Sequence, residues 1–200
     1  MSQYEIKHRP MGPYQTNCFI VTYEGKDLII DPGIDATAWV LKNTTNPIAI
    51  LNTHGHFDHV WSNGELKEKL NIPIYCPIGD AMLVEDDALM KGIPANKIDI
   101  KVEGDQGYEL EGIKINFHHF PGHTPGCSAI EIGEHLFTGD FIFDGSIGRV
   151  DFPFSSPADM VKSIEKVLKW EKNYKVYPGH GNFSTLFQQK DSLKAWINYI

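Results

Sequence analysis

The sequence lacks any apolar stretch of 18 residues or more, the length that a membrane-spanning helix needs. Its first residues, MSQYEIKHRPMG, lack the apolar core of a secretory signal. No run of Lys or Arg is present, and 18 basic against 26 acidic residues give a formal net charge of −8. A basic face for a phosphate backbone is therefore missing. We expect a cytoplasmic protein that binds neither a membrane nor a nucleic acid.

Cysteine is scarce, with only Cys18, Cys76 and Cys127, and no C-x-x-C pair occurs. An odd number of widely spaced cysteines predicts neither a disulfide framework nor a thiolate zinc site. We expect all three to be small buried hydrophobic residues. A functional role stays open for Cys127, because it follows His123 by four residues.

The chain has no low-complexity segment, long linker or short-period repeat, which predicts a single domain over residues 1–200. Short apolar runs predict strands at 18–23, 28–31, 47–52, 74–76 and 175–177, and alternation predicts more between 101 and 143. Helical spacing predicts helices at 60–70, 80–91 and 186–199, and one that begins at Pro157 behind a Ser156 cap. The expected class is α/β (α+β), with two sheets covered by helices.

The segment THGHFDH follows the predicted strand 47–52 and concentrates polar donors. It places His54, His56, Asp58 and His59 within six residues, which serves no obvious packing purpose. Two imidazoles separated by one residue can converge on one ion, while the next two side chains turn toward a neighbouring position. Histidine nitrogen and carboxylate oxygen suit a catalytic divalent metal site.

Three further donors lie on glycine-rich loops: His123 in PGHTPG, Asp140 in TGD and His180 in PGHG. Loops beyond strand ends are where catalytic groups usually lie. Taken alone, His123 or His180 would more often be a surface or packing histidine, and Asp140 could cap a turn. Together with the first cluster they predict a metal site. The remaining histidines are interpreted as structural or exposed: His8, His118, His119 and His135.

In this order, the four motifs resemble those of the metallo-β-lactamase fold superfamily over most of the chain. The resemblance implies a four-layer αββα sandwich. It also implies a site with two divalent metal ions, zinc foremost and iron or manganese as alternatives. One ion would be bound by His54, His56 and His123, the other by Asp58, His59 and His180, and Asp140 would bridge both.

Within that superfamily the chain is most similar to the glyoxalase II (hydroxyacylglutathione hydrolase) group, in its short bacterial form without the C-terminal helical domain. The likeness is carried by the segments MGPYQTNCFIV, GDFIFDGSIGRVDFP and PGHGNFSTL. It implies a small-molecule thioester substrate, S-(2-hydroxyacyl)glutathione, that a metal-bridging hydroxide attacks. Asp58 would orient that hydroxide or take its proton, and Arg149 would anchor the anionic end of the substrate. For Arg149 a salt bridge to Asp144 or Asp151 that holds the loop is the alternative.

Two alternatives remain open at this point. A persulfide dioxygenase of the same superfamily, with a single iron, resembles the chain around residues 147–152. A non-catalytic binding domain stabilised by metal belongs to a different class of function. A single iron with oxygen consumption would indicate the dioxygenase. Complete ligands with no turnover of any thioester, ester, lactone or persulfide would indicate the binding domain.

Overall fold

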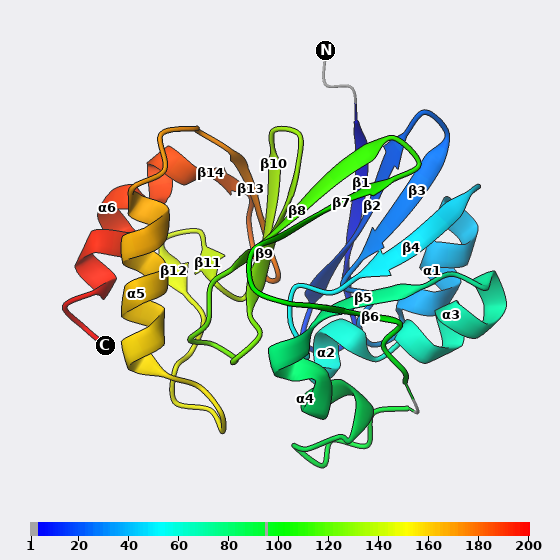
Figure 1. Ribbon diagram of the computed structural model, residues 1–200, viewed down its shortest axis with the longest axis horizontal. Coiled ribbons are helices and arrows are strands. Elements are labelled where there is room, and N and C mark those ends of the chain that lie inside the picture. The colour runs from blue at the N-terminus through cyan, green and yellow to red at the C-terminus, as the bar shows by residue number, and fades with distance from the viewer. Residues whose placement is uncertain (1–3, 95) are drawn as a thin grey trace. The chain divides into compact units, whose positions relative to one another are not determined.

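We describe a computed structural model of the chain, which covers residues 4–94 and 96–200 (Figure 1). The chain forms two compact units, Met1–Val102 and Glu103–Ile200, and each is described by itself. The prediction of a single domain over 1–200 stays a prediction. Within the described residues, no helix combines the length and the apolar character that crossing a membrane requires.

The first unit is built on a mixed six-stranded sheet whose strand order follows the sequence. Its strands are β1 (Glu5–Met11), β2 (Thr16–Tyr23), β3 (Lys26–Ile30), β4 (Pro47–Leu51), β5 (Ile74–Pro77) and β6 (Ile100–Val102). The first three pair antiparallel, whereas β3, β4, β5 and β6 run parallel to their neighbours. The carboxyl ends of the parallel strands therefore meet at one edge of this sheet.

Four helices belong to the first unit: α1 (Ala36–Asn43), α2 (Phe57–Val60), α3 (Asn63–Leu70) and α4 (Ala81–Glu85). A short 3₁₀ turn, η1 (Ile78–Asp80), precedes α4. One face of the sheet contributes Ile29, Ile50 and Ile74 to a buried cluster. Val40 of α1 and Leu66 of α3 complete that cluster, so these helices cover this face of the sheet (Figure 1).

The helix predicted over 60–70 is wrong in its extent, because the structure breaks it into α2 and α3. Ser62 lies at the break and is buried. Its backbone N–H donates to the carbonyl of Pro32 at 3.0 Å, and its hydroxyl donates to the carbonyl of Gly33 at 2.6 Å. These bonds to the loop after β3 replace the bonds of a continuous helix.

The helix predicted over 80–91 is also shorter, since α4 ends at Glu85. Asp87 has a positive φ of 46°, which no helix tolerates. Its carboxylate accepts hydrogen bonds from the backbone N–H groups of Lys91 and Gly92 at 2.9 and 2.7 Å. Local side-chain bonds of this kind compete with helix and produce a turn over 87–92.

The second unit contains another mixed six-stranded sheet, in the order β14-β13-β10-β9-β8-β7. Its strands are β7 (Gln106–Leu110), β8 (Ile113–His119), β9 (Ser128–Ile132), β10 (His135–Gly139), β13 (Lys175–Pro178) and β14 (Ser184–Thr185). Only β10 and β13 pair in parallel. A hairpin of β11 (Ile142–Phe143) and β12 (Ser146–Ile147) follows β10.

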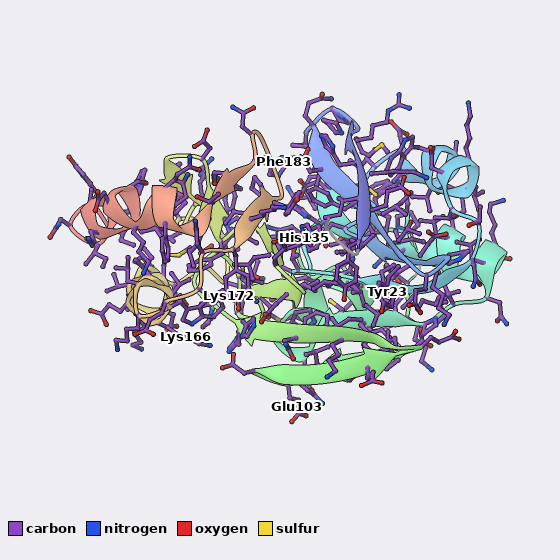
Figure 2. All side chains as sticks on the ribbon, turned by 90° about the horizontal axis from the view of Figure 1, so that it is seen from above. Tyr23, Glu103, His135, Lys166, Lys172 and Phe183 are labelled. Atoms are coloured by element: carbon purple, nitrogen blue, oxygen red, sulfur yellow. The ribbon has the colours of Figure 1, made fainter. Side chains whose placement is uncertain are left out.

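Two helices pack on this second sheet, α5 (Pro157–Leu168) and α6 (Leu186–Trp196). The predicted start of α5 is confirmed, because the Ser156 hydroxyl accepts from the N–H of Asp159 and proline occupies the first turn. Ile164 of α5, Leu193 of α6 and Val176 of β13 are fully buried together. Lys166 and Lys172, labelled in Figure 2, pair with Asp105 and Glu131 at the surface of this unit.

Besides the short elements η1, β12 and β14, strand β1 and helix α1 were not predicted. Strand β1 contains Pro10 and few apolar residues, and it lies at the edge of its sheet, where a strand needs no second hydrogen-bonding partner. Helix α1 is only eight residues long, too short for a clear apolar period.

Candidate metal centre

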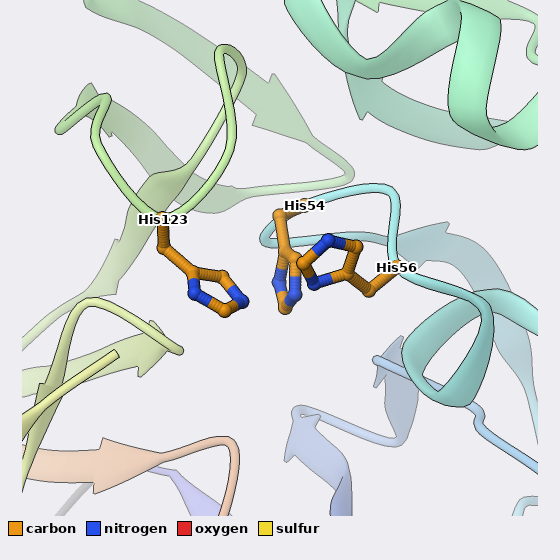
Figure 3. A group of neighbouring side chains, drawn as sticks. All are labelled: His54, His56 and His123. Atoms are coloured by element: carbon orange, nitrogen blue, oxygen red, sulfur yellow. The ribbon is translucent and has the colours of Figure 1, made fainter. Parts of the chain in front are cut away.

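The donors of the first unit follow directly from the parallel strands. Asp31 comes immediately after β3, and the segment from Asn52 to His59 follows β4 and enters α2. His54 and His59 are fully buried, and His56 and Asp58 are 7% and 9% exposed. The structure thus gathers the four donors of the THGHFDH segment in one buried loop. Figure 3 shows the imidazole rings of His54 and His56 on this loop. Their ring centroids are 4.9 Å apart.

Asp31 organises this loop and was missed as a site residue from the sequence. Its Oδ1 accepts the backbone N–H of Thr53 at 2.8 Å, and its Oδ2 accepts the Thr53 hydroxyl at 2.6 Å. The same Oδ2 lies 3.0 Å from Nδ1 of His59. A carboxylate that holds the outer nitrogen of a histidine fixes the ring for metal binding through its other nitrogen. The only signal in the sequence was its place at a predicted strand end.

The hydrogen bonds assign the tautomers of two rings. The Thr53 hydroxyl gives its proton to Asp31, so it accepts from Nδ1–H of His54 at 3.1 Å. His59 likewise donates Nδ1–H to the Asp31 carboxylate. With both protons on Nδ1, the Nε2 atoms of His54 and His59 carry lone pairs, which is the form that binds a metal.

The Asp58 side chain is fixed from β2. The Thr16 hydroxyl donates to Asp58 Oδ2 at 2.8 Å, and both residues are buried. The same Oδ2 lies 3.5 Å from Nε2 of His59. Gly33 makes this placement possible, since a Cβ there would lie 1.9 Å from the carbonyl oxygen of Asp58.

A second buried carboxylate holds the peptide between the first two histidines. Asp80, at the end of the 3₁₀ turn after β5, is fully buried and accepts the N–H of Gly55 at 2.8 Å. A Cβ on Gly55 would lie 2.8 Å from Cβ of Asp80. The close approach explains why glycine stands between His54 and His56.

The donors of the second unit come from three separate loops. His123 lies between β8 and β9 (Figure 3), Asp140 follows β10, and His180 follows β13. The loops after β10 and β13 are joined by a hydrogen bond from the N–H of Gly179 to the carbonyl of Gly139 at 2.8 Å. His123 and Asp140 are buried, whereas the His180 side chain is 27% exposed.

Asp140 stands between the two histidines of its unit. Its Oδ2 lies 3.4 Å from Nε2 of His123 and 3.5 Å from Nε2 of His180. His123 Nδ1 lies 2.8 Å from the carbonyl oxygen of Arg149 and must donate its proton, because a carbonyl only accepts. This leaves the lone pair of His123 on Nε2, on the side of Asp140.

Gly148 lies against the carbonyl oxygen of Asp140, as Gly33 lies against that of Asp58 in the first unit. A Cβ at position 148 would lie 1.8 Å from the carbonyl oxygen of Asp140 and 3.0 Å from Cγ of His123. The backbone of the loop after β12 therefore lies directly against two donors. Any side chain at this position would displace Asp140, His123 or the loop itself.

The spacing of the donor atoms fits a metal. With bonds of about 2.0–2.1 Å in a tetrahedral site, two ligand atoms lie roughly 3.3–3.4 Å apart. Three nitrogen–oxygen separations, 3.4, 3.5 and 3.5 Å, match this distance and are longer than good hydrogen bonds. The set contains only nitrogen and carboxylate oxygen, the donors expected for zinc, iron or manganese.

The Arg149 side chain lies on the surface. Its guanidinium forms two hydrogen bonds to the carboxylate of Asp151, at 2.7 and 2.8 Å, and its Cζ lies 4.3 Å from the ring centroid of Phe152. Both charged side chains are 64% exposed. The bond raises the pKa of Arg149 and lowers that of Asp151. The proposed role in substrate binding stays a prediction.

None of the three cysteines forms a disulfide and all are buried, which confirms the prediction that they are small buried hydrophobic residues. Burial raises the pKa of the Cys18 and Cys76 thiols well above its usual range. Cys127 belongs to the apolar core of the second unit. Of the histidines read as structural, burial lowers the pKa of His8 and His135, and His118 binds Glu131 at 2.8 Å.

The sequence profile of the metallo-beta-lactamase superfamily matches residues 11–180. Hydroxyacylglutathione hydrolase GloC of Haemophilus influenzae is 34% identical over 203 residues, which cover 92% of this chain and 93% of that protein. Among solved structures, TTHA1623 in a di-iron-bound form is 32% identical with a TM-score of 0.80, covering 93% of this chain and 98% of that one. BLEG-1 B3 metallo-beta-lactamase is 29% identical with a TM-score of 0.82, and the match covers 94% of this chain and 97% of that one.

These matches confirm the predicted α/β fold of the metallo-β-lactamase type, with a mixed sheet and flanking helices in each unit. They extend over both sets of donors. The chain therefore belongs to the metallo-beta-lactamase superfamily and has the fold and the buried His and Asp donors of its metal-dependent hydrolases.

Proposed function

We propose that this chain hydrolyses a thioester of the S-(2-hydroxyacyl)glutathione class at a site with two divalent metal ions. The two donor sets would serve one site, with Asp140 shared between the ions. The ligands would be His54, His56, Asp58, His59, His123, Asp140 and His180.

The observation that carries the proposal is the position of Asp140. A carboxylate oxygen at 3.4 and 3.5 Å from the Nε2 atoms of His123 and His180 is suited to a ligand shared by two ions. The match of residues 11–180 to the family supports the joining of the two sets, because it spans both. The identity of 34% with GloC supports the substrate class.

When bound, two divalent ions lower the pKa of a water toward about 7, far below its value in bulk solvent, and polarise the carbonyl under attack. Asp58 would take or hold a proton of that water, and Thr16 keeps its carboxylate in place through Oδ2. Asp31 and the Arg149 carbonyl would keep His59 and His123 in the metal-binding tautomer. A thiol of pKa about 8.5 leaves as thiolate without a strong general acid, and the motifs supply no such acid.

The metal remains part of the proposal. Zinc was the first expectation, with iron or manganese as alternatives. TTHA1623 was described in a di-iron-bound form, and its 32% identity makes iron an equal candidate for this chain. No thiolate is present among the donors to select zinc.

The test combines metal content with turnover. Protein reconstituted separately with zinc, iron and manganese is analysed for metal and assayed with S-lactoylglutathione. We expect two equivalents and thioester cleavage for the natural chain, less metal for His56→Ala, and no change for His8→Ala, whose ring lies on β1 and stacks on Phe19. One equivalent of iron, oxygen uptake with glutathione persulfide and no thioester cleavage would instead identify a dioxygenase.

A second candidate is hydrolysis of a β-lactam amide, favoured by the TM-score of 0.82 and 29% identity with BLEG-1. An amide leaving group is a far stronger base than a thiolate and needs a proton from an acid as it departs. We therefore expect turnover of nitrocefin to be slower than that of the thioester. Two bound metals with no turnover of any thioester, ester, lactone, persulfide or β-lactam would favour a non-catalytic binding domain.

A further inference from the structure

An aromatic surface lies beside the metal donors within the first unit. Tyr14 lies in the turn between β1 and β2, and its ring meets the ring of Phe57 edge to face, with centroids 5.1 Å apart and planes at 89°. Phe57 itself lies between His56 and Asp58 in the sequence. Trp61 continues the surface, 6.5 Å from Phe57.

The position of this surface relative to the donors is fixed by neighbouring contacts. Two residues beyond Tyr14, the Thr16 hydroxyl binds the Asp58 carboxylate. The start of β2 therefore contacts a metal donor through Thr16, and the turn before it contacts the adjacent ring through Tyr14. The Tyr14 side chain is 55% exposed and Phe57 is half-buried, so both rings are accessible beside the donors.

The ammonium group of Lys91 lies over this surface. Nζ of Lys91 lies 5.7 Å from the ring centroid of Phe57, within the range of a cation–π contact. The turn that presents it is fixed by Asp87, whose carboxylate accepts the N–H groups of Lys91 and Gly92. In the described part of the chain, the Lys91 ammonium forms no ion pair with a carboxylate.

Arg149 differs in this respect. Its guanidinium already holds the Asp151 carboxylate through two hydrogen bonds, at 2.7 and 2.8 Å. A substrate carboxylate would have to displace Asp151 before it could use Arg149. No such exchange is needed at Lys91.

We propose that Lys91 binds the carboxylate of an anionic thioester, and that Tyr14 and Phe57 pack against the apolar part of the same molecule. The inference rests on the proposed thioester hydrolase, and it assigns the recognition of the anionic end to the first unit. Aromatic faces offer apolar contact area, and an exposed ammonium offers a point charge for a carboxylate.

The experiment measures binding and turnover separately. Metal-loaded protein is titrated by calorimetry with S-hexylglutathione, a thioether that has carboxylates and an apolar chain but no bond to cleave. We expect Lys91→Ala to weaken binding about 3- to 10-fold and Lys91→Glu to weaken it more, since the site is exposed to solvent. Added salt should weaken binding by the natural chain more than by Lys91→Ala. Tyr14→Ala should weaken binding at all salt concentrations, and Tyr14→Phe should not.

Lys42→Ala is the matched control, because Lys42 is also an exposed lysine of the first unit but lies in the last turn of α1. Arg149→Ala tests the competing anchor. The inference is overturned if the natural chain does not bind S-hexylglutathione, if Lys91→Ala binds as tightly as Lys42→Ala, or if only Arg149→Ala weakens binding.

Turnover distinguishes this inference from the proposed function. With S-lactoylglutathione, Lys91→Ala should lower kcat/KM about 3- to 10-fold through KM. With the uncharged S-lactoyl-N-acetylcysteamine, the same variant should match the natural chain. A protein that binds S-hexylglutathione through Lys91 but cleaves no thioester would refute the proposed hydrolase and keep the binding site. If Lys91→Ala cleaves the thioester as well as the natural chain, the hydrolase is supported and the binding site at Lys91 is refuted.

Discussion

The two units hold their metal donors by different means. Both units have a glycine whose backbone lies against a donor carbonyl, Gly33 in the first and Gly148 in the second. In the first unit, buried side chains hold the donors as well: Asp31 holds His59 and the Thr53 loop, and Thr16 holds Asp58. In the second unit, the backbone holds them: the Arg149 carbonyl holds His123, and Gly148 lies against Asp140. Side-chain supports can be removed one at a time by substitution, whereas backbone supports are disturbed only by adding atoms. Both units should therefore respond to added atoms at their glycines, and the first should also respond to the removal of a supporting side chain.

The largest difference is expected between the two carboxylate donors. Asp140→Ala should lose both metals and reduce turnover at least about a thousandfold, because the proposed shared ligand would serve both ions and the metals would supply several kcal/mol of catalysis. Asp58→Ala should lose the second ion preferentially and keep the first. Metal analysis and kcat/KM on the same preparations compare them. Full metal content in Asp140→Ala would show that this residue does not bridge.

The next largest effect is a loss of stability when alanine replaces Gly148 or Gly33, the two glycines that lie against the carbonyl oxygens of donor aspartates. Gly148→Ala and Gly33→Ala should each lower the free energy of unfolding by about 3–5 kcal/mol, since a Cβ would come within 1.8 and 1.9 Å of the Asp140 and Asp58 carbonyl oxygens. Urea unfolding and metal content are measured together. Gly107→Ala is the control, because its Cβ would approach the end of the Asn116 side chain at 2.9 Å and would meet backbone only at the ordinary contact distance of 3.9 Å, at the Ile115 carbonyl oxygen. Equal stability of Gly148→Ala and Gly107→Ala would contradict the role assigned to the backbone.

The support of the first unit can be weakened without adding atoms. Asp31→Asn should reduce metal affinity about 10- to 100-fold, because the amide no longer stabilises the His59 Nδ1–H bond with a full charge. Arg149→Ala is the matched variant in the second unit. It keeps the carbonyl that holds His123, so its metal affinity should stay at the natural level. Competition with a chromophoric chelator measures the metal affinity of both variants. If Asp31→Asn and Arg149→Ala lose metal affinity equally, the distinction between side-chain and backbone supports is wrong.

The smallest effect is a dependence of stability on pH in the second unit. Desolvation raises the pKa of Glu131, but hydrogen bonds from His118, Lys172 and Tyr174 outweigh it and lower the pKa from 4.5 to about 2. Because the folded pKa lies below the unfolded one, the stabilisation is present above pH 4.5 and is lost as the pH falls toward 2. The loss between pH 7 and pH 3 should be about 2 kcal/mol.

Metal-free protein is used for this measurement, so that acid release of metal does not contribute. Glu131→Gln should be less stable at pH 7. Its free energy of unfolding, measured with urea, should fall less steeply as the pH is lowered into the acid range; this part of the curve is called the acid limb. Hydrogen exchange should locate the change in β8, β9 and β10 of the second unit. Glu165→Gln, an exposed acid on α5, is the control and should keep the natural acid limb. Parallel acid limbs for all three proteins would exclude this role of Glu131.

Much of the fold was predictable where one local signal dominates. The apolar run that became β4, Pro47–Leu51, and the Ser-Pro start of α5 agree closely with the prediction. Errors arose where tertiary contacts override local preference. Ser62 breaks a helix by binding the carbonyl of Gly33, which lies 29 residues away in the sequence. No local pattern records such a contact.

The metal donors were predictable because their residue types are unusual in these positions. Four donors in the THGHFDH segment identify the first set from sequence alone. Asp31 was missed because a single aspartate after a strand resembles an ordinary turn residue, and its three hydrogen bonds to Thr53 and His59 exist only in the folded chain. The role of Gly148 could not be predicted, because its closeness to Asp140 is a property of the backbone path.

The crowding of four donors into residues 54–59 also bears on folding. An unfolded chain already offers a metal this short segment, whereas His123, Asp140 and His180 are separated by 17 and 40 residues and meet only after β10 and β13 have paired. Metal stabilises a protein by the difference between its affinities for the folded and unfolded chains. The gain from metal is therefore reduced at the first set and nearly complete at the second. During refolding, the first segment can capture an ion early, whereas the donors of the second set come together late.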